Sequence, residues 1–300
     1  MNQKLGQFVE GSVSRRRFLA GAGAAVAATT LIVGCGDDGS AMGGGGGGGT
    51  TTLTDADYLN FALNLEYLEA EFYLRAATGN GLAASDTGNS TSKTTGGSQV
   101  PGMSSLQTQY VNEIAQNELD HVRFLRNALG SSAVMAPAID LTNSFNALAS
   151  AAGLGTSFNP FASYGNFLIG AFIFEDVGVT AYHGAAKLLT SKTNLTYAAE
   201  IHAVEAYHAA AIRVQIVAAG STAISTANAV EGVRSMLGGG NETTLSATGI
   251  VAADSTNSIG FERTTDQVLH IVYGTGGGAG VKSGTFFPSG LNGNISVTQA

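Results

Sequence analysis

The sequence is poor in cysteine, in basic residues and in long apolar runs, and each shortage excludes a class of protein. Cys35 is the only cysteine among 300 residues, so no disulfide can form within the chain. Outside residues 1–34 the chain carries 10 basic and 21 acidic groups, a net charge of −11. That balance argues against a nucleic-acid partner, which requires a basic face. The apolar run 20–33 is too short and too rich in small residues for a good membrane span.

Glycine, in contrast, is abundant, with 42 residues. Such a content indicates long irregular segments and not a larger core. Residues 43–49 are all glycine, and a stretch without side chains to bury behaves as a flexible tether. We therefore assign residues 36–52 to a Gly-rich linker.

The N-terminus has the pattern of a targeting segment. The stretch from Ser14 to Leu19, SRRRFL, resembles the twin-arginine export signal and precedes the apolar run. Residues 32–35, IVGC, resemble a bacterial lipobox, which predicts lipidation of Cys35; the alternative is a plain signal peptide with an incidental cysteine. Residues 1–35 are thus predicted to be a twin-arginine signal with a lipobox. We expect a periplasmic or cell-envelope protein, held at the membrane by a lipid anchor on Cys35.

A motif of fourteen residues occurs twice, at 113–126 (EIAQNELDHVRFLR) and at 200–213 (EIHAVEAYHAAAIR). Aligned without a gap, the two copies share these pairs: Glu113 with Glu200, Ile114 with Ile201, Glu118 with Glu205, His121 with His208, and Arg126 with Arg213. Each copy contains Glu-x-x-His, which places a carboxylate and an imidazole one turn apart on one helical face. Two such pairs on two helices are half of a dinuclear metal site.

The repeat extends to the helix that precedes each motif. Glu66 is followed seven residues later by Tyr73, and Glu175 by Tyr182, so each tyrosine lies on the same helical stripe as its glutamate. Each half of the chain therefore offers one Glu and then Glu-x-x-His. The predicted metal ligands are Glu66, Glu118, His121, Glu175, Glu205 and His208, the ligand set of di-iron and di-manganese carboxylate proteins.

Charge explains why these residue types are needed together. Four carboxylates balance two divalent cations, and the metals remove the penalty of several kcal/mol that each unpaired carboxylate incurs in an apolar interior. Mixed carboxylate and imidazole ligation suits iron or manganese, although zinc would also bind. Chance predicts on the order of 0.2 Glu-x-x-His pairs in such a composition, against two found in register. The competing interpretation is that these carboxylates lie on solvated helix faces.

Four further residues are candidates for contacts with the ligands. Glu69 lies one turn from Glu66 and is an alternative ligand, but its counterpart in the repeat is Gly178, which favours Glu66. Tyr73 and Tyr182 either hydrogen-bond to ligands or relay electrons, or simply pack within the bundle. His202, one turn before Glu205, is either a hydrogen-bond donor to the site or an ordinary core or surface histidine.

The apolar spacing predicts an all-α fold. The four long helices are expected at 54–77, 106–129, 162–189 and 196–219, the last of them ended by Gly220, with a short helix at 143–151. The long connection between the second and third helices is the crossover of a four-helix bundle spanning 53–220. Residues 221–300, with two expected helices at 227–237 and 263–272, are predicted to form a Gly-rich, irregular wrap packed on the bundle.

With these residues identified, the chain resembles the ferritin-like domain proteins, in particular the exported bacterial group often called desiccation-related. The resemblance covers roughly 53–220, and the segments 272–274 (VYG) and 286–288 (FFP) are also similar to that group. It implies a four-helix bundle with a dinuclear centre. Activities in the superfamily include ferroxidase, peroxidase, manganese catalase and oxygenase, and fold alone does not choose among them.

Three functions are consistent with these patterns. The first is an exported redox enzyme whose two iron or manganese ions act on a small oxidant, peroxide or oxygen. The second is a metal-binding or iron-oxidising protein without turnover of a second substrate. The third is a structural envelope protein, stabilised by its metals or protecting others during drying. The sequence leaves the oligomeric state open.

Overall fold

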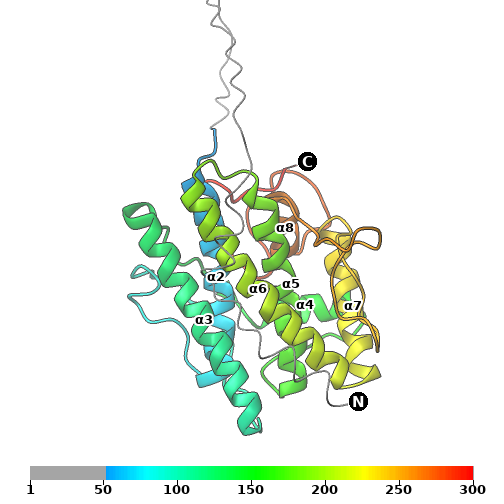
Figure 1. Ribbon diagram of the computed structural model, residues 1–300. Helices are drawn as coiled ribbons and strands as arrows, with labels where there is room; N and C mark the ends of the chain where they lie inside the picture. The colour runs from blue at the N-terminus through cyan, green and yellow to red at the C-terminus, as the bar shows by residue number, and fades with distance from the viewer. Residues whose placement is uncertain (1–51, 300) are drawn as a thin grey trace, which may run out of the picture. The chain divides into compact units, whose positions relative to one another are not determined.

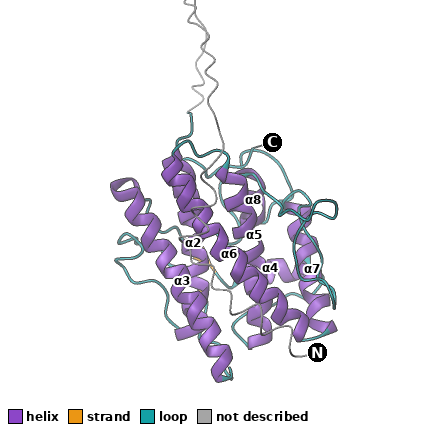
Figure 2. Ribbon diagram, in the orientation of Figure 1, coloured by secondary structure: helices purple, strands orange, loops and turns teal. Residues whose placement is uncertain are grey.

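The computed structural model describes residues 52–299, which fold into helices joined by long loops (Figures 1 and 2). The four long helices are α2 (Asp55–Thr78), α3 (Ser105–Leu129), α5 (Tyr164–Ala186) and α6 (Lys192–Ala218). Helix α2 packs along α3, α5 packs along α6, and α2 also packs against α5. The predicted all-α bundle is thereby confirmed. No helix in this described part combines the length and apolarity that a membrane crossing requires.

The bundle helices begin at polar caps that the local sequence supplies. At the start of α2, the Thr54 N–H donates to the Asp57 carboxylate at 2.7 Å, one half of a capping box. Ser104 and Gln107 cap each other in the same way at the start of α3. Helix α6 begins at Lys192, four residues before the predicted start, because the Ser191 side chain accepts a hydrogen bond from the Asn194 N–H.

The region around Gly220 differs from the prediction. Helix α6 ends at Ala218, and Gly220 is the N-cap of the next helix, α7 (Ser221–Leu237), which begins six residues before the predicted 227. Gly220 has φ +99°, a backbone conformation that glycine adopts without penalty. The glycine therefore reverses the chain directly into a new helix and does not lead into a loop.

The crossover from α3 to α5 contains three short elements. These are η2 (Gly130–Ser132), β2 (Ile139–Asp140) and α4 (Asn143–Ala151), the last with the predicted bounds. Strand β2 pairs in parallel with β1 (Thr94–Thr95) in the loop between α2 and α3. The pairing ties the crossover to that loop, and the chain then enters α5.

An aromatic cluster joins α2 to α5 and to the crossover. The Phe72 ring of α2 stacks on Phe167 at 5.5 Å between centroids and meets Phe174 edge to face at 5.2 Å, both from α5. Phe145 of α4 packs on Phe72 as well, at 5.9 Å. Burying each ring stabilises the fold by roughly 1.5–3 kcal/mol. The cluster thus holds together the two helices that carry Glu66 and Glu175.

The C-terminal segment packs on α5 through α7 and α8 (Thr265–Tyr273). Buried arginines attach it there. Arg234 of α7 donates one hydrogen bond to Asp176 Oδ2 at 2.8 Å and two to the Glu242 carboxylate at 2.6 Å each. Arg263 donates to Thr180 Oγ1 at 2.7 Å. Buried charges of this kind persist only when paired, so the segment is joined to α5 at defined points.

Candidate metal centre

The six predicted ligands converge in the middle of the bundle, one or two from each long helix. All are buried: the four glutamates have no exposed surface, while His121 and His208 are 9% and 5% exposed. The alternative of solvated surface carboxylates is therefore wrong, because all four carboxylates lie in the interior of the bundle.

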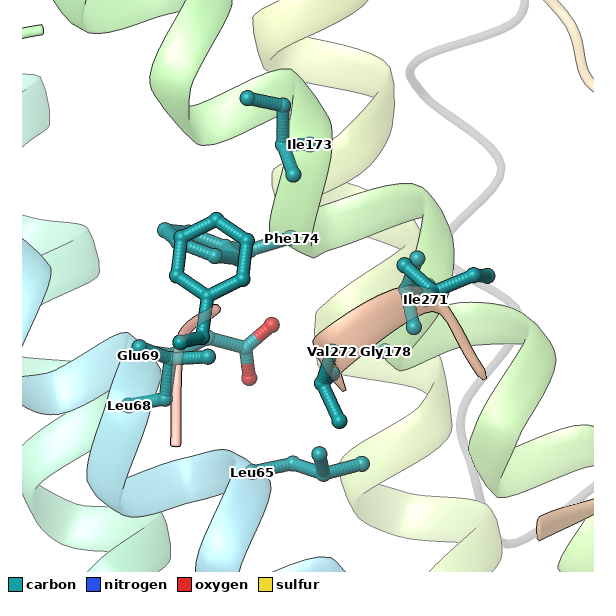
Figure 3. A pocket seen from close by; sticks show the side chains of 10 residues that line it. Leu65, Leu68, Glu69, Ile173, Phe174, Gly178, Ile271 and Val272 are labelled. Carbon is teal, nitrogen blue, oxygen red and sulfur yellow. The ribbon is translucent and has the colours of Figure 1, made fainter. Parts of the chain in front are cut away.

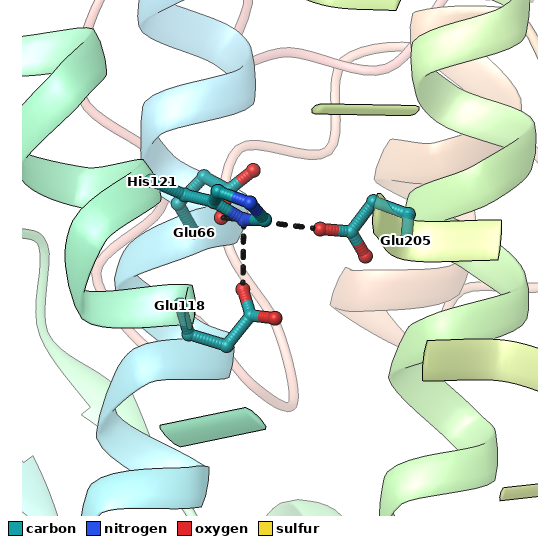
Figure 4. A group of neighbouring side chains, drawn as sticks. All are labelled: Glu66, Glu118, His121 and Glu205. Atoms are coloured by element: carbon teal, nitrogen blue, oxygen red, sulfur yellow. Dashed lines mark ion pairs between the residues drawn. The ribbon is translucent and has the colours of Figure 1, made fainter. Parts of the chain in front are cut away.

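One group of side chains surrounds the His121 ring (Figure 4). Its Nδ1 atom lies 3.2 Å from Glu66 Oε2, 3.4 Å from Glu118 Oε2 and 3.3 Å from Glu205 Oε1. These four atoms come from α2, α3 and α6. Three carboxylates and one imidazole converging on one point are a suitable donor set for a divalent cation.

A second group lies beside the first and shares Glu118 with it. His208 Nδ1 lies 2.9 Å from Glu118 Oε1 and 3.6 Å from Glu175 Oε2. Glu118 therefore directs one oxygen toward each imidazole, and the two ring centroids are 6.3 Å apart. The arrangement offers two adjacent metal positions with Glu118 between them.

The hydrogen bonding of this cluster is incomplete in a way that fits metal ions. In the described part of the chain, nine buried side-chain nitrogen and oxygen atoms make no hydrogen bond of acceptable geometry, and eight of them belong to the six residues. The imidazole and carboxylate atoms approach one another at 2.9–3.6 Å but lack the alignment of a hydrogen bond. They include the Nδ1 atoms of His121 and His208 and both oxygens of Glu118 and of Glu205. An unsatisfied buried polar atom costs about 1–3 kcal/mol, more when charged, so eight at one point require another partner. Cations bound by these atoms would supply it.

Electrostatics of the metal-free cluster lead to the same conclusion. Burial raises the pKa of Glu66 to about 7, although the His121 imidazole opposes the shift. Burial and the nearby Glu118 raise the pKa of Glu205 well above its usual range. Burial alone would lower the pKa of His208, but Glu175 and Glu118 outweigh it and raise the value to about 11. Without metals the cluster therefore retains protons, and bound cations would displace them.

Each tyrosine of the repeat reaches across the bundle to the glutamate of the other half. The Tyr73 hydroxyl of α2 donates to Glu175 Oε1 of α5, and the Tyr182 hydroxyl of α5 donates to Glu66 Oε1 of α2. Hydrogen bonding to the carboxylates, one of the roles expected for these tyrosines, is therefore present. Each bond engages one carboxylate oxygen and leaves the other, Oε2, facing the centre.

Asn117 contacts the site and was not predicted. Its Oδ1 lies 3.0 Å from His208 Nε2, so Nε2–H donates to the amide oxygen and leaves Nδ1 as the nitrogen that a bound cation would deprotonate and occupy. In the repeat, Asn117 corresponds to Val204, which has no polar side chain. The two copies also differ at eight other positions, so the repeat gave no signal for this residue.

Glu69 lies beside the cluster but belongs to neither group. Its side chain is 4% exposed and points into a water-sized cavity of about 20 Å³, lined by apolar residues of α2, α5 and α8 and by Phe286 (Figure 3). Its counterpart Gly178 faces the same region: a Cβ there would lie 2.7 Å from Glu205 Oε2 and 3.3 Å from Glu69 Oε1. Gly178 thus leaves room for both carboxylates, and Glu66 is the one that faces His121.

His202 contacts another histidine. Its ring lies 5.8 Å from the ring of His183, and burial lowers its pKa. No hydrogen bond joins it to the six residues in the described range 52–299. The predicted lipidation site, Cys35, and the whole of the predicted signal lie outside that range.

The arginine that closes each copy of the motif also contacts the partner helix of its own half. Arg126 Nη1 donates to the Tyr67 hydroxyl at 2.6 Å, and Arg213 Nη1 donates to Asp176 Oδ2 at 2.7 Å. Tyr67 and Asp176 directly follow the predicted ligands Glu66 and Glu175. The repeat showed the two arginines, but their partners are unlike residues and were not visible in it.

Comparison with known proteins agrees with this geometry. The family described as Ferritin-like domain matches residues 54–218. The chain is 27% identical over 269 residues to the ferritin-like catalase Nec2 of Nesocodon mauritianus, covering 81% of this chain and 85% of that one. It is 28% identical over 241 residues to the desiccation-related protein PCC13-62 of Craterostigma plantagineum, covering 72% and 76%. The resemblance drawn from the sequence is confirmed: the chain belongs to the ferritin-like domain family.

Proposed function

We propose that this protein binds two iron or manganese ions at Glu66, Glu118, His121, Glu175, Glu205 and His208 and converts hydrogen peroxide to water and oxygen. The observation that carries the proposal is the set of eight buried donor and acceptor atoms without hydrogen-bond partners at one point. The name of one relative, a ferritin-like catalase, supports peroxide as the substrate.

When bound, a redox-active metal pair supplies Lewis acidity and stores the electrons that pass between two peroxide molecules. The residues of the chain prepare the place where this happens. Tyr73 and Tyr182 hold Glu175 and Glu66 by one oxygen each, and Asn117 holds the His208 ring. The buried position of all six residues excludes bulk water, which strengthens the electrostatic attraction between carboxylates and cations.

The test combines metal analysis with oxygen release. Full-length protein loaded with iron or manganese is expected to hold about two ions per chain and to evolve oxygen from peroxide, as measured with an oxygen electrode. The double variant Glu118→Ala, His121→Ala should lose both properties. Glu200→Ala, on the exposed surface of α6, is the control and should keep them. Two bound metals without turnover for either metal would refute the catalytic proposal.

A second candidate is a metal-stabilised envelope protein that acts during drying and does not turn over a substrate. The name of the other relative, a desiccation-related protein, favours it. The same double variant separates the two functions. If Glu118→Ala, His121→Ala retains the full biological effect while folded, the structural role holds and the enzymatic one fails.

The proposed location follows from residues 1–35. The twin-arginine motif directs export of the folded protein, and a lipid on Cys35 holds it at the envelope. Cell fractionation tests both steps. Replacing Arg15, Arg16 and Arg17 together by lysine is expected to retain the protein in the cytoplasm, and Cys35→Ser to release exported protein from the membrane fraction. Unchanged fractionation of both variants would overturn the proposal.

A further inference from the structure

We propose that the groove between α3 and α6, next to His208, binds a small neutral aromatic molecule that carries a hydroxyl group, a phenol. The inference deepens the proposed function and rests on it, because it names an organic ligand for the same centre.

The groove exists because the two helices that carry the histidines pack on α2 and α5 and only sparsely on one another. Near one end they touch, where the rings of Phe124 and Tyr197 meet edge to face at 4.8 Å. On the other side of the metal centre they leave an open groove of about 630 Å³. Its lining includes Asn117 and His208, so its floor is the hydrogen bond that orients a predicted metal ligand.

The volume of the groove is far larger than peroxide requires. A water molecule occupies roughly 30 Å³ of liquid, and peroxide has only two heavy atoms. Pockets for organic ligands span roughly 300–1,000 Å³. A groove of this size beside the Asn117–His208 pair therefore suits an organic molecule, whereas peroxide would occupy only a small part of its volume.

The walls select the chemistry of that molecule. The rings of Tyr110 and Tyr207 and the aliphatic side chains of Ile114 and Val214 offer apolar contact for a flat ring. The acidic side chain in the lining is Glu113, an acceptor that attracts a hydroxyl donor and repels anions. Together they favour a neutral phenol over a carboxylate of the same size.

A second copy of the chain is the competing occupant, since Tyr207 and Val214 are 76% and 46% exposed. The concave shape and the polar floor favour the small molecule, because a broad protein surface would not reach the Asn117–His208 pair at the bottom of the groove. The experiment below distinguishes the two.

Isothermal titration of the full-length, metal-loaded protein with 2-methoxyphenol tests the inference. We expect saturable binding at one site per chain, no saturable binding of benzoate, and at least tenfold weaker binding of the phenol by Val214→Trp, whose indole fills the groove. Tyr207→Ala, which removes one wall, should also weaken binding. Asn127→Trp is the matched control, because it is the exposed α3 position that corresponds to Val214 in the repeat.

Three results would overturn the inference: no saturable binding of the phenol, equal affinity in Val214→Trp, or a dimer in size-exclusion chromatography that Val214→Trp dissociates. The last would assign the groove to a second copy. The experiments distinguish failure of the proposed peroxide activity from failure of the proposed phenol site. Phenol binding without oxygen release refutes only the peroxide activity, and oxygen release without phenol binding refutes only the groove.

Discussion

At the scale of single residues, the two halves of the chain contribute matching ligands to the proposed metal centre, and they differ at two positions beside it. Asn117 in the first half corresponds to Val204 in the second, and Glu69 corresponds to Gly178. The first difference gives His208 an amide partner that the valine cannot offer His121. The second gives one side of the centre an extra buried carboxyl. The two proposed metal positions would therefore be chemically unequal.

Replacing Asn117 by valine should weaken one metal position and spare the other. Without the amide oxygen, the His208 ring is free to rotate or to protonate Nδ1, and the loss of such a partner reduces metal affinity roughly 10–100-fold. Metal titration against a competing chelator is expected to resolve one weakened and one unchanged ion per chain. Asn117→Asp, which keeps an acceptor, should restore most of the affinity. Equal weakening of both ions would contradict a role confined to His208.

Gly178→Ala should disturb the centre without opening the fold. The added methyl would lie 2.7 Å from Glu205 Oε2, so the carboxylate must leave its present position, in which Oε1 lies 3.3 Å from His121 Nδ1. Such overpacking costs about 1–3 kcal/mol, and we expect metal content per chain to fall, measured by elemental analysis after dialysis. The control is Gly232→Ala in α7, where the methyl meets nothing within 4 Å. Full metal content in the Gly178 variant would show that the glycine is not needed for the site.

At the scale of helices, α5 is the central element of the molecule. Nearly all of its residues from Phe167 to Tyr182 are buried, including the adjacent acids Glu175 and Asp176. Helices α2 and α6 cover the side that carries Glu175, while α7 and α8 pack on α5 as well. Asp176 receives Arg213 from α6 and Arg234 from α7, so neighbouring residues of one helix connect the metal centre with the C-terminal segment. Because α5 is apolar on nearly all of its faces, other elements must pack against it on every side.

Gly184→Ala should weaken the seating of the C-terminal segment on α5. A Cβ at Gly184 would overlap the backbone carbonyl of Arg263, and backbone atoms cannot move aside by changing a rotamer. We expect the free energy of unfolding to fall by about 1–3 kcal/mol in urea titration, with two metals still bound. Gly232→Ala, by comparison, should raise it by about 0.5–1 kcal/mol, because alanine favours a helix more than glycine does. An unchanged free energy of unfolding in the Gly184 variant would contradict this, because it would mean that the C-terminal segment moves away from α5 without loss of stability.

At the scale of the whole molecule, the fold encloses more acid than its own side chains can neutralise. Glu69 lies beside the four predicted carboxylate ligands, and burial and then Glu205 raise its pKa well above the usual range. Without cations the folded protein keeps protons on several of these buried groups, and bound cations would take their place. Metal content should consequently control stability as well as activity.

The metal-free protein should lose thermal stability as pH rises from 5 to 8. The folded pKa of Glu66 is raised from 4.5 to about 7 and that of Glu205 is also raised, so the folded state binds more protons than the unfolded state in this range. Their contribution is present at low pH and disappears as pH rises through those folded values. Glu118, with its pKa lowered to about 2, has the opposite sign, but its contribution changes below pH 4.5, outside this window.

Differential scanning calorimetry measures this effect. We expect the Tm of metal-free protein to fall by on the order of 5 °C between pH 5 and pH 8, and Glu66→Gln to flatten the slope. The metal-loaded protein should show no such fall, because its ligands bind cations more tightly once deprotonated. A metal-free Tm that rises with pH would contradict the assigned directions.

Much of the architecture was accessible from local patterns. The bundle helices, the short helix at 143–151 and the grouping of the six residues were predicted because helix geometry converts sequence spacing directly into a shared face. Glu-x-x-His needs no knowledge of the rest of the chain. The early start of α7 was missed because Gly220 is equally compatible with a stop and with a reversal.

The relations across the bundle could only emerge from folding. Tyr73 meets Glu175 across 102 residues, Tyr182 meets Glu66 across 116, and Asn117 meets His208 across 91. No local spacing encodes such contacts, because they depend on which helices pack together and at what height. The same holds for the arginines on Asp176 and for the groove beside His208. Local sequence thus specified which side chains share a helix face, and packing decided which faces meet.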